Sequence, residues 1–255
     1  MVIFIEELVV YNKEDNQIVY KIIKNEGNKV LISGVNYRKI MEVASEEVTS
    51  INASLLEKEN LRSEKYISYT YKKINHRGVG KRLGTVMHFD SDKNYLIRCE
   101  DLYKSMNIYC YPVLTSEEEL KNRIEVMDCD FIPDVLVITG HDYYDGDNLK
   151  DLNSYKNSLH FTKAVLAAKR RFPESVIVAG ACQSNFEALI ASGANFASSP
   201  KRVNVHVYDP VIIAIYVCST SFRKIIDFEE LEKHIEGLRE GFGGVETLGK
   251  MKMLY

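Results

Sequence analysis

Short apolar runs separated by polar turns dominate the beginning of the chain. Four of them are rich in β-branched and aromatic residues, and turns such as Asn25-Glu26-Gly27-Asn28 lie between them. The runs extend from Val9 to Tyr11, Ile18 to Ile23, Val30 to Ser33 and Tyr37 to Val43. Strands of this length that follow one another without helices predict a small β-barrel domain over residues 1–60.

A change in composition follows this first domain. A short helix is expected around Ser54 to Leu61, and the next segment is rich in Lys, Arg and Tyr. It ends in Arg77-Gly78-Val79-Gly80-Lys81-Arg82, which is typical of an exposed basic linker, here residues 61–83. A phosphate-binding loop is excluded because that motif requires a preceding strand and a Ser or Thr where Arg82 stands.

From residue 84 to residue 255 apolar runs alternate with amphipathic segments. The run Val135-Leu136-Val137-Ile138-Thr139 is typical of a parallel strand that is covered on both faces. The alternation predicts an α/β domain in which a parallel sheet lies between helices. Strands are expected at 85–90, 108–113, 135–139 and 176–179, and helices at 95–106, 153–171 and 185–191.

Three further segments belong to this α/β pattern. Thr115 and Ser116 are expected to cap a helix whose first turn contains Glu117-Glu118-Glu119, where acidic side chains favour the helix dipole. The apolar runs 203–208 and 211–217 continue the pattern, and the first of them is interpreted as a strand. The glycine-rich segment 241–247 is expected to loop over another part of the domain.

Composition and charge narrow the function classes. Hydrophobic residues make up 45% of the chain and charged residues 27%, as in an ordinary soluble globular protein. The formal net charge of -3 indicates neither nucleic acid nor an anionic membrane as a partner. No apolar stretch approaches the roughly 20 residues that span a bilayer, and the N-terminus lacks the basic region of a secretion signal.

The cysteines provide a further constraint. There are five, at irregular spacing and without a C-x-x-C pair, which argues against a zinc ribbon and against a disulfide framework. The pattern favours a reducing compartment. We find no metal constellation in the sequence and therefore expect no cofactor.

Two strand ends carry reactive side chains. The predicted strand at 135–139 is followed by Gly140-His141-Asp142, and the strand at 176–179 by Gly180-Ala181-Cys182. Sites in open α/β sheets form outside the carboxyl ends of the strands. We therefore expect His141 and Cys182 to project from one edge of the sheet.

A histidine and a cysteine at one edge are the components of a thiol hydrolase. The start of the following helix would favour the thiolate form of Cys182, and His141 would accept and return a proton. Backbone N–H groups at Cys182 and just after His141 are expected to bind the oxyanion. Asp142 has three open roles: it orients the imidazole, helps to select substrate, or caps the following turn.

The order of the pair favours one class of cysteine peptidase. In the caspase-type signature, a strand ending in His precedes a strand ending in Ala-Cys by about 50 residues. This chain repeats that plan, except that Asp142 stands where caspase-like enzymes usually have glycine. Glutaminase-type amidases usually place the cysteine first. The predicted fold is therefore a caspase-like parallel-sheet sandwich with a small N-terminal β-barrel.

Several segments make a family resemblance visible. They are Pro133 to Asp142, Asp151 to Tyr155, Ala179 to Ser184, Ala191 to Pro200 and Arg202 to His206. The chain resembles the YabG family of sporulation-specific proteases from endospore-forming bacteria. The similarity is densest from Pro133 to Pro210, returns in the Gly-Gly-Val-Glu-Thr stretch from Gly243, and is looser in the N-terminal part.

This resemblance implies a function. It implies a cysteine endopeptidase that trims spore coat and spore-morphogenesis proteins in the mother-cell cytoplasm, in association with the developing spore surface or coat. The histidine and cysteine of the family fall on His141 and Cys182, with Asp142 beside the histidine. A competing hypothesis is a non-catalytic spore-coat scaffold whose barrel docks partners.

Two further residues are candidates for substrate binding. His206 follows Val203-Asn204-Val205 in the strand expected there, and Asp209 ends that strand at the presumed edge. Asp209 is a candidate for an acidic pocket that holds a basic substrate residue, although a carboxylate at this place equally suits a turn. His206 is a candidate for lining the same pocket.

Overall fold

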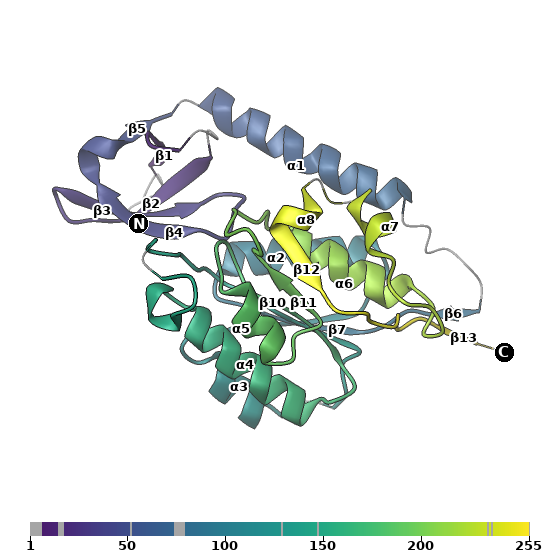
Figure 1. Ribbon diagram of the computed structural model, residues 1–255. Coiled ribbons are helices and arrows are strands. Elements are labelled where there is room, and N and C mark those ends of the chain that lie inside the picture. Colours follow the sequence, from purple (N-terminus) through teal and green to yellow (C-terminus); the bar gives the residue numbers. More distant parts are fainter. Residues whose placement is uncertain are drawn as a thin grey trace.

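The chain folds around two sheets, with one long helix alongside them (Figure 1). The computed structural model describes residues 7–14, 18–51, 53–73, 80–128, 130–146, 148–233, 235 and 237–254. The expected α/β class is confirmed, since a mainly parallel sheet is combined with a separate antiparallel one.

The N-terminal part is a five-stranded antiparallel sheet of order β4-β3-β2-β1-β5. Its strands are β1 (Leu8–Tyr11), β2 (Val19–Asn25), β3 (Lys29–Gly34), β4 (Ile40–Ala44) and β5 (Val48–Ser50). The expected barrel is not confirmed, because the sheet is not closed: η1 (Ser45–Glu47) joins β4 to β5, and these two strands are the edges of the sheet and do not pair with each other.

Helix α1 (Ala53–Lys73) covers much of the segment predicted as a linker. The expected helix at Ser54 to Leu61 is confirmed but continues for three more turns. Glu59 and Ser63 are buried on one side of α1, at the four-residue spacing of a helix face. Because these inward positions are polar, the sequence shows no apolar stripe there.

The end of the predicted linker is only partly described. Residues 74–79, which include Gly78 and Val79, lie outside the described residues. The next two residues with regular structure form β6 (Lys81–Arg82), which pairs with β13 (Lys252–Met253). This part of the basic stretch is therefore a short strand.

The second sheet has six strands in the order β12-β11-β10-β9-β7-β8. They are β7 (Val86–Asp90), β8 (Cys110–Leu114), β9 (Val135–Ile138), β10 (Val176–Ala179), β11 (Phe196–Ser198) and β12 (Phe242–Gly244). All neighbours are parallel except β12, which runs antiparallel to β11. The four predicted strands are confirmed. In the glycine-rich segment 241–247, residues 242–244 form an edge strand, and residues 245–247 have no regular structure.

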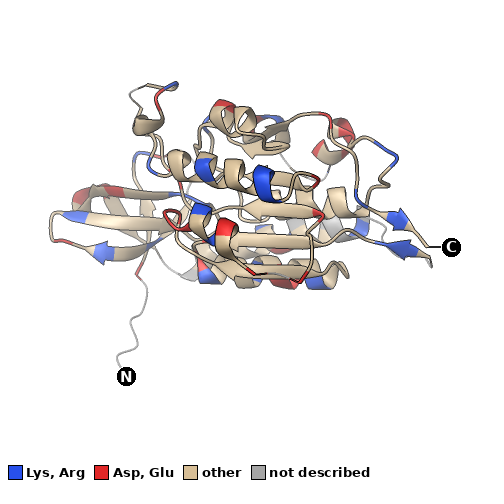
Figure 2. Ribbon diagram, turned by 90° about the horizontal axis from the view of Figure 1, so that it is seen from below, with Lys and Arg blue, Asp and Glu red and all other residues tan. Residues whose placement is uncertain are grey.

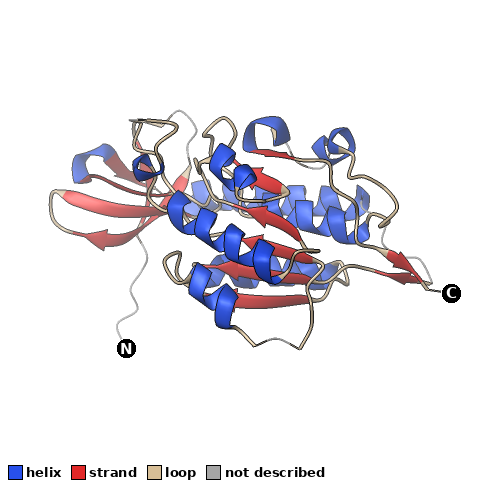
Figure 3. Cartoon of the chain, turned by 60° about the horizontal axis from the view of Figure 1, so that its bottom comes forward, coloured by secondary structure: helices blue, strands red, loops and turns tan. Residues whose placement is uncertain are grey.

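Helices cover both faces of this sheet (Figure 3). Val135 and Val137 pack toward α2 (Lys93–Ser105) and α6 (Asp209–Ser219), whereas Leu136 and Ile138 pack toward the opposite helices. The opposite layer consists of α3 (Leu120–Val126), α4 (Ser158–Arg171) and α5 (Phe186–Ala191). The short elements η2 (Leu152–Ser154), α7 (Phe228–Glu232) and α8 (Leu238–Gly241) complete the chain.

Three sequence predictions are wrong in this domain. The strand expected at 203–208 is absent, since residues 203–205 have no regular structure. The next apolar run, 211–217, lies in α6, which is buried on nearly all sides. Helix α3 begins at Leu120, which leaves Glu117 in the preceding loop. Helix α4 begins at Ser158, because the first residues of the expected 153–171 helix form η2 instead.

The distribution of charged residues, the apolar character of the helices and the state of the cysteines agree with what the composition predicts. Lys and Arg are interspersed with Asp and Glu over the elements seen in Figure 2. Among the described helices, none has the length and apolar character that crossing a membrane requires. Four of the five cysteines are described and are free thiols, while Cys129 lies outside the described residues.

The fold predicts where stability is concentrated. Ile138 on β9 is fully buried, so Ile138→Ala should lower the free energy of unfolding by about 2–5 kcal/mol through lost burial and a residual cavity. Ile132 is 75% exposed, and Ile132→Ala should change it by less than about 0.5 kcal/mol. Urea unfolding measures both, and equal losses would contradict this placement of the core.

Candidate functional site

The strand order locates a crevice at one edge of the parallel sheet. From β7 the chain builds β8 on one side and then β9, β10 and β11 on the other. The carboxyl ends of β7 and β9 therefore border the point where the order reverses, which is where open α/β sheets bind ligands. Asp90 ends β7 at this point, and His141 follows β9.

His141 and Cys182 leave neighbouring strands at the same level. Ile138 on β9 is the register partner of Ala179 on β10. Each of these partners is followed three residues later by one of the two reactive side chains. Parallel neighbours lie about 4.8 Å apart, so the backbones that carry the two residues emerge side by side. The predicted location at one sheet edge is confirmed.

The imidazole of His141 lies in a polar cluster, and the side chain is 10% exposed. Its Nε2 is 3.2 Å from Ser33 Oγ, and its Nδ1 is 3.3 Å from Ser91 Oγ. Asp92 Oδ2 lies 4.0 Å from Nε2. Among the described residues, the hydrogen-bond partners of this ring do not include Cys182. The N-terminal sheet thus contributes Ser33 directly to the site.

Glu117 anchors this cluster, and sequence reasoning missed it. Its Oε1 accepts hydrogen bonds from the His141 backbone N–H at 2.7 Å and from Ser91 Oγ at 2.5 Å, and lies 3.8 Å from His141 Nδ1. Burial raises the pKa of Glu117, but these hydrogen bonds outweigh burial and the net pKa is lowered. The side chain is therefore a carboxylate held against the histidine.

The thiol of Cys182 is fully buried and bonded to the backbone of Val205. The Sγ atom accepts the Val205 N–H at 3.1 Å and lies 3.5 Å from the Val205 carbonyl oxygen. Burial raises the pKa of Cys182 to about 12, although the Val205 N–H and the cations Lys39 and Arg38 act in the opposite direction. The group is a thiol in this conformation.

The expected thiolate at a helix start is therefore wrong for this conformation. Helix α5 begins at Phe186, and Cys182 lies before it in a turn where Gln183 has a φ of 58°. Cys182 is therefore not part of the first turn of α5, where the favourable effect of the helix dipole is concentrated.

Asp142 holds the loops around the site together. Its buried carboxylate accepts hydrogen bonds from the backbone N–H of Asn157 at 2.7 Å, from Ser158 Oγ at 2.5 Å and from Ser184 Oγ at 2.8 Å. Burial raises its pKa, while these hydrogen bonds act to lower it. The described contacts link the exit of β9 to the start of α4 and to the turn after Cys182. They do not reach the imidazole.

The connection between β3 and β4 crosses the carboxyl edge of the parallel sheet. Tyr37 forms a bridge with His206, and Lys39 forms a bridge with Asp142. Between them, the Arg38 carbonyl oxygen accepts the Cys182 N–H at 3.3 Å. One of the backbone N–H groups expected to bind an oxyanion is thus already occupied by a peptide carbonyl.

The Arg38 side chain is the largest fully buried one in the described chain. Its guanidinium forms an ion pair with Asp90 and lies 3.3 Å from the Val207 carbonyl oxygen. Burial raises the pKa of Asp90, but the adjacent Arg38 charge lowers it. The lowering is the larger effect, so the net pKa lies below the usual range. The sequence showed Arg38 only as part of an expected strand.

His206 and Asp209 lie beside this crossing segment. His206 Nε2 is 3.1 Å from Ser63 Oγ, and burial lowers the pKa of this histidine to about 3. Asp209 Oδ2 accepts the His206 backbone N–H at 3.0 Å. The prediction that Asp209 ends a strand is wrong, because it lies in the first turn of α6, where it also holds a turn.

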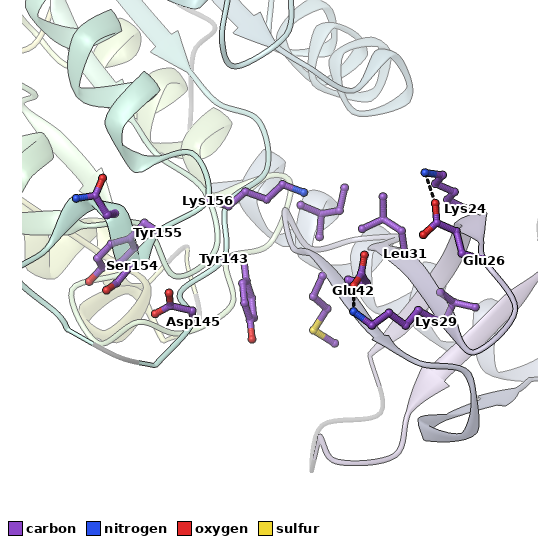
Figure 4. A pocket seen from close by; sticks show the side chains of 14 residues that line it. Lys24, Glu26, Lys29, Leu31, Glu42, Tyr143, Asp145, Ser154, Tyr155 and Lys156 are labelled. Carbon is purple, nitrogen blue, oxygen red and sulfur yellow. Dashed lines mark hydrogen bonds and ion pairs between the residues drawn. The ribbon is translucent and has the colours of Figure 1, made fainter.

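Two cavities open between the N-terminal sheet and the segment after β9. One of about 470 Å³ has Leu31 on one wall and Tyr143 on the other (Figure 4). The second, of about 500 Å³, is lined in part by Lys39 and Gln183. Because Gln183 directly follows Cys182, open space reaches the neighbour of the thiol. Among the described residues, no group of His, Cys, Asp and Glu suits a metal ion.

Comparison with known proteins gives a family. No solved structure matches the chain. It is 42% identical over 175 residues to the sporulation-specific protease YabG of Bacillus subtilis (strain 168), a match that covers 67% of this chain. The chain spans 60% of the length of that relative. A family model described as YabG peptidase U57 matches residues 5–255, and the chain therefore belongs to the YabG peptidase U57 family.

Proposed function

We propose that this chain is a cysteine endopeptidase in which Cys182 is the nucleophile and His141 the general base and acid. The observation that carries the proposal is the register of β9 and β10, which brings both residues out of the sheet at one level. Family membership supports peptidase activity. The order of the two residues, and the alanine that precedes Cys182, support a caspase-like arrangement of the site.

The chemistry follows that of other thiol peptidases. His141 accepts the thiol proton, and Sγ attacks the carbonyl carbon of the scissile peptide to form a C–S bond. The C–N bond then breaks, and the proton passes to the leaving amine. Water, deprotonated by His141, hydrolyses the thioester, which releases the carboxyl fragment and restores the thiol. This sequence requires Cys182 to exchange its Val205 contact for the imidazole.

The Cys182 N–H suits the stabilisation of a developing oxyanion. It already holds a peptide carbonyl oxygen, that of Arg38, at hydrogen-bond distance. A donor fixed by the backbone needs no reorganisation when negative charge forms on a substrate oxygen. Asp142 supports this arrangement through Ser184, which also bonds the backbone N–H of Ala181 at 2.9 Å.

Glu117 is proposed as the positioning residue for the imidazole. It binds the His141 backbone and, with Ser91, faces the Nδ1 side of the ring. A carboxylate on that side fixes the ring and stabilises the imidazolium that forms when the thiol proton is transferred. The proposed constellation is thus Cys182 and His141, with Glu117 and Ser91 behind the histidine.

The substrates proposed are spore coat and spore-morphogenesis proteins, cleaved at the surface of the developing spore on the mother-cell side. The name of the Bacillus subtilis relative supports a role in sporulation. His206 and Asp209 remain proposed substrate-binding residues, and their position beside Tyr37 next to the site supports this. Residues 84–255 are proposed to carry the chemistry, with Ser33 as a contribution from the N-terminal sheet.

Replacing the proposed nucleophile tests the mechanism. Cys182→Ala should reduce cleavage of a spore-coat protein mixture by about 10³-fold or more, because no other group can form the thioester. Mass spectrometry of the fragments measures the rate. Cys110→Ala, at a partly buried cysteine on β8, is the matched control and should retain activity. Undiminished cleavage by a folded Cys182→Ala chain would rule out the thiol mechanism. Loss of cleavage in a folded Cys182→Ala chain would exclude a purely scaffolding role.

Neutralising Glu117 tests its positioning role. Glu117→Gln should lower kcat about 100-fold and move the acidic limb of the pH–rate profile to lower pH, because the imidazolium loses a stabilising charge. KM should change little, since Glu117 is not expected to touch substrate. The control is Glu118→Gln at the exposed neighbour, which should keep both kcat and profile. An unchanged pH profile for Glu117→Gln would leave this residue with only a structural role.

A further inference from the structure

The segment Tyr37–Lys39, here called the crossing segment, lies across the site as a tight turn, in which the Lys39 N–H donates to the Tyr37 carbonyl oxygen at 2.8 Å. It is bridged on one side to His206 and on the other to Asp142. Its central carbonyl oxygen occupies the Cys182 N–H. Main-chain hydrogen bonds combined with a pocket for a side chain are also how bound peptides are recognised at sheet edges.

The crossing segment is anchored by more than its backbone. The Arg38 guanidinium is buried against Asp90, which also accepts Thr139 Oγ1 at 2.9 Å. Tyr95 donates its hydroxyl to the Tyr37 carbonyl oxygen at 3.0 Å. Withdrawal of the segment would leave an unpaired charge in a site that is fully buried now, which is costly. The closed arrangement is therefore the stable one.

We infer that the crossing segment occupies the peptide-binding site of this proposed protease, so that the chain as folded is latent until the segment is withdrawn. This inference rests on the proposed function and concerns the regulation of the same site. The Arg38 carbonyl oxygen of the segment fills the place of a substrate carbonyl at the Cys182 N–H, and Cys182 Sγ is bonded to Val205 instead of His141. A protein substrate competes with a segment that is tethered at both ends and present at high effective concentration.

Gly34 offers a way to disturb the crossing segment without touching the buried charges. A Cβ at this position would lie 2.4 Å from the Tyr37 carbonyl oxygen, so the backbone of the segment has to shift. Gly27 lies at the other end of the same sheet, in the β2–β3 turn, at a φ of +82°, and a Cβ there meets no atom within 4 Å. Gly27→Ala is thus a matched control that strains the sheet away from the site.

The first experiment measures how fast iodoacetamide modifies Cys182 in the full chain at pH 8. In the chain without a substitution we expect slow alkylation of Cys182. Gly34→Ala should accelerate this alkylation about 10- to 100-fold, since a clash of this kind destabilises the closed form. Gly27→Ala should leave the rate unchanged. Equal alkylation rates in all three folded chains, or equal acceleration in both variants, would overturn the inference that the crossing segment occupies the site.

The second experiment measures cleavage of a denatured protein substrate by the same chains. Gly34→Ala should cleave at least about tenfold faster than the unmodified chain, and Arg38→Met, which removes the buried anchor charge, provides an independent release of the segment. Faster alkylation together with no cleavage in any chain would contradict the proposed peptidase function. It would still support the inference that the crossing segment occupies the site. Faster alkylation with unchanged, measurable cleavage would overturn latency.

Discussion

The buried ion pair between Arg38 and Asp90 joins the two sheets, and the site is arranged around it. Both side chains are wholly inaccessible, and removing two charges from water costs several kcal/mol for each ion. The cost is offset by additional donors: Thr139 Oγ1 and the Asp92 N–H both bind the Asp90 carboxylate. Since Arg38 belongs to the β3–β4 connection, the pair fixes the N-terminal sheet against the carboxyl edge of the parallel sheet.

The position of the reactive pair follows from local sequence features. The continuous apolar runs at β9 and β10 are long enough to identify as strands, and Gly140 and Gly180 end them one residue or two before the reactive side chains. Parallel pairing then places equivalent residues side by side. For this reason the strands and the location of His141 and Cys182 could be predicted, and the family resemblance added the proposed substrates.

The remaining features depend on contacts that sequence patterns do not encode. Glu117 belongs to an acidic segment that is typical of a first helical turn, yet its carboxylate binds a backbone N–H 24 residues away. Arg38 lies in an alternating β-rich run, and only the approach of β7 gives its charge a partner. The apolar run in α6 satisfies a strand and a buried helix equally well, so periodicity alone cannot choose between them.

The edge strand β12 has a consequence for the order of events during synthesis. Residues 242–244 complete the mainly parallel sheet as its antiparallel edge strand, and they leave the ribosome long after the N-terminal sheet. Domains generally fold as units from the N-terminus during translation. The β3–β4 connection is therefore formed before the turn that carries Cys182 can be completed. The nascent chain therefore completes the edge that carries Cys182 against a segment that is already in place.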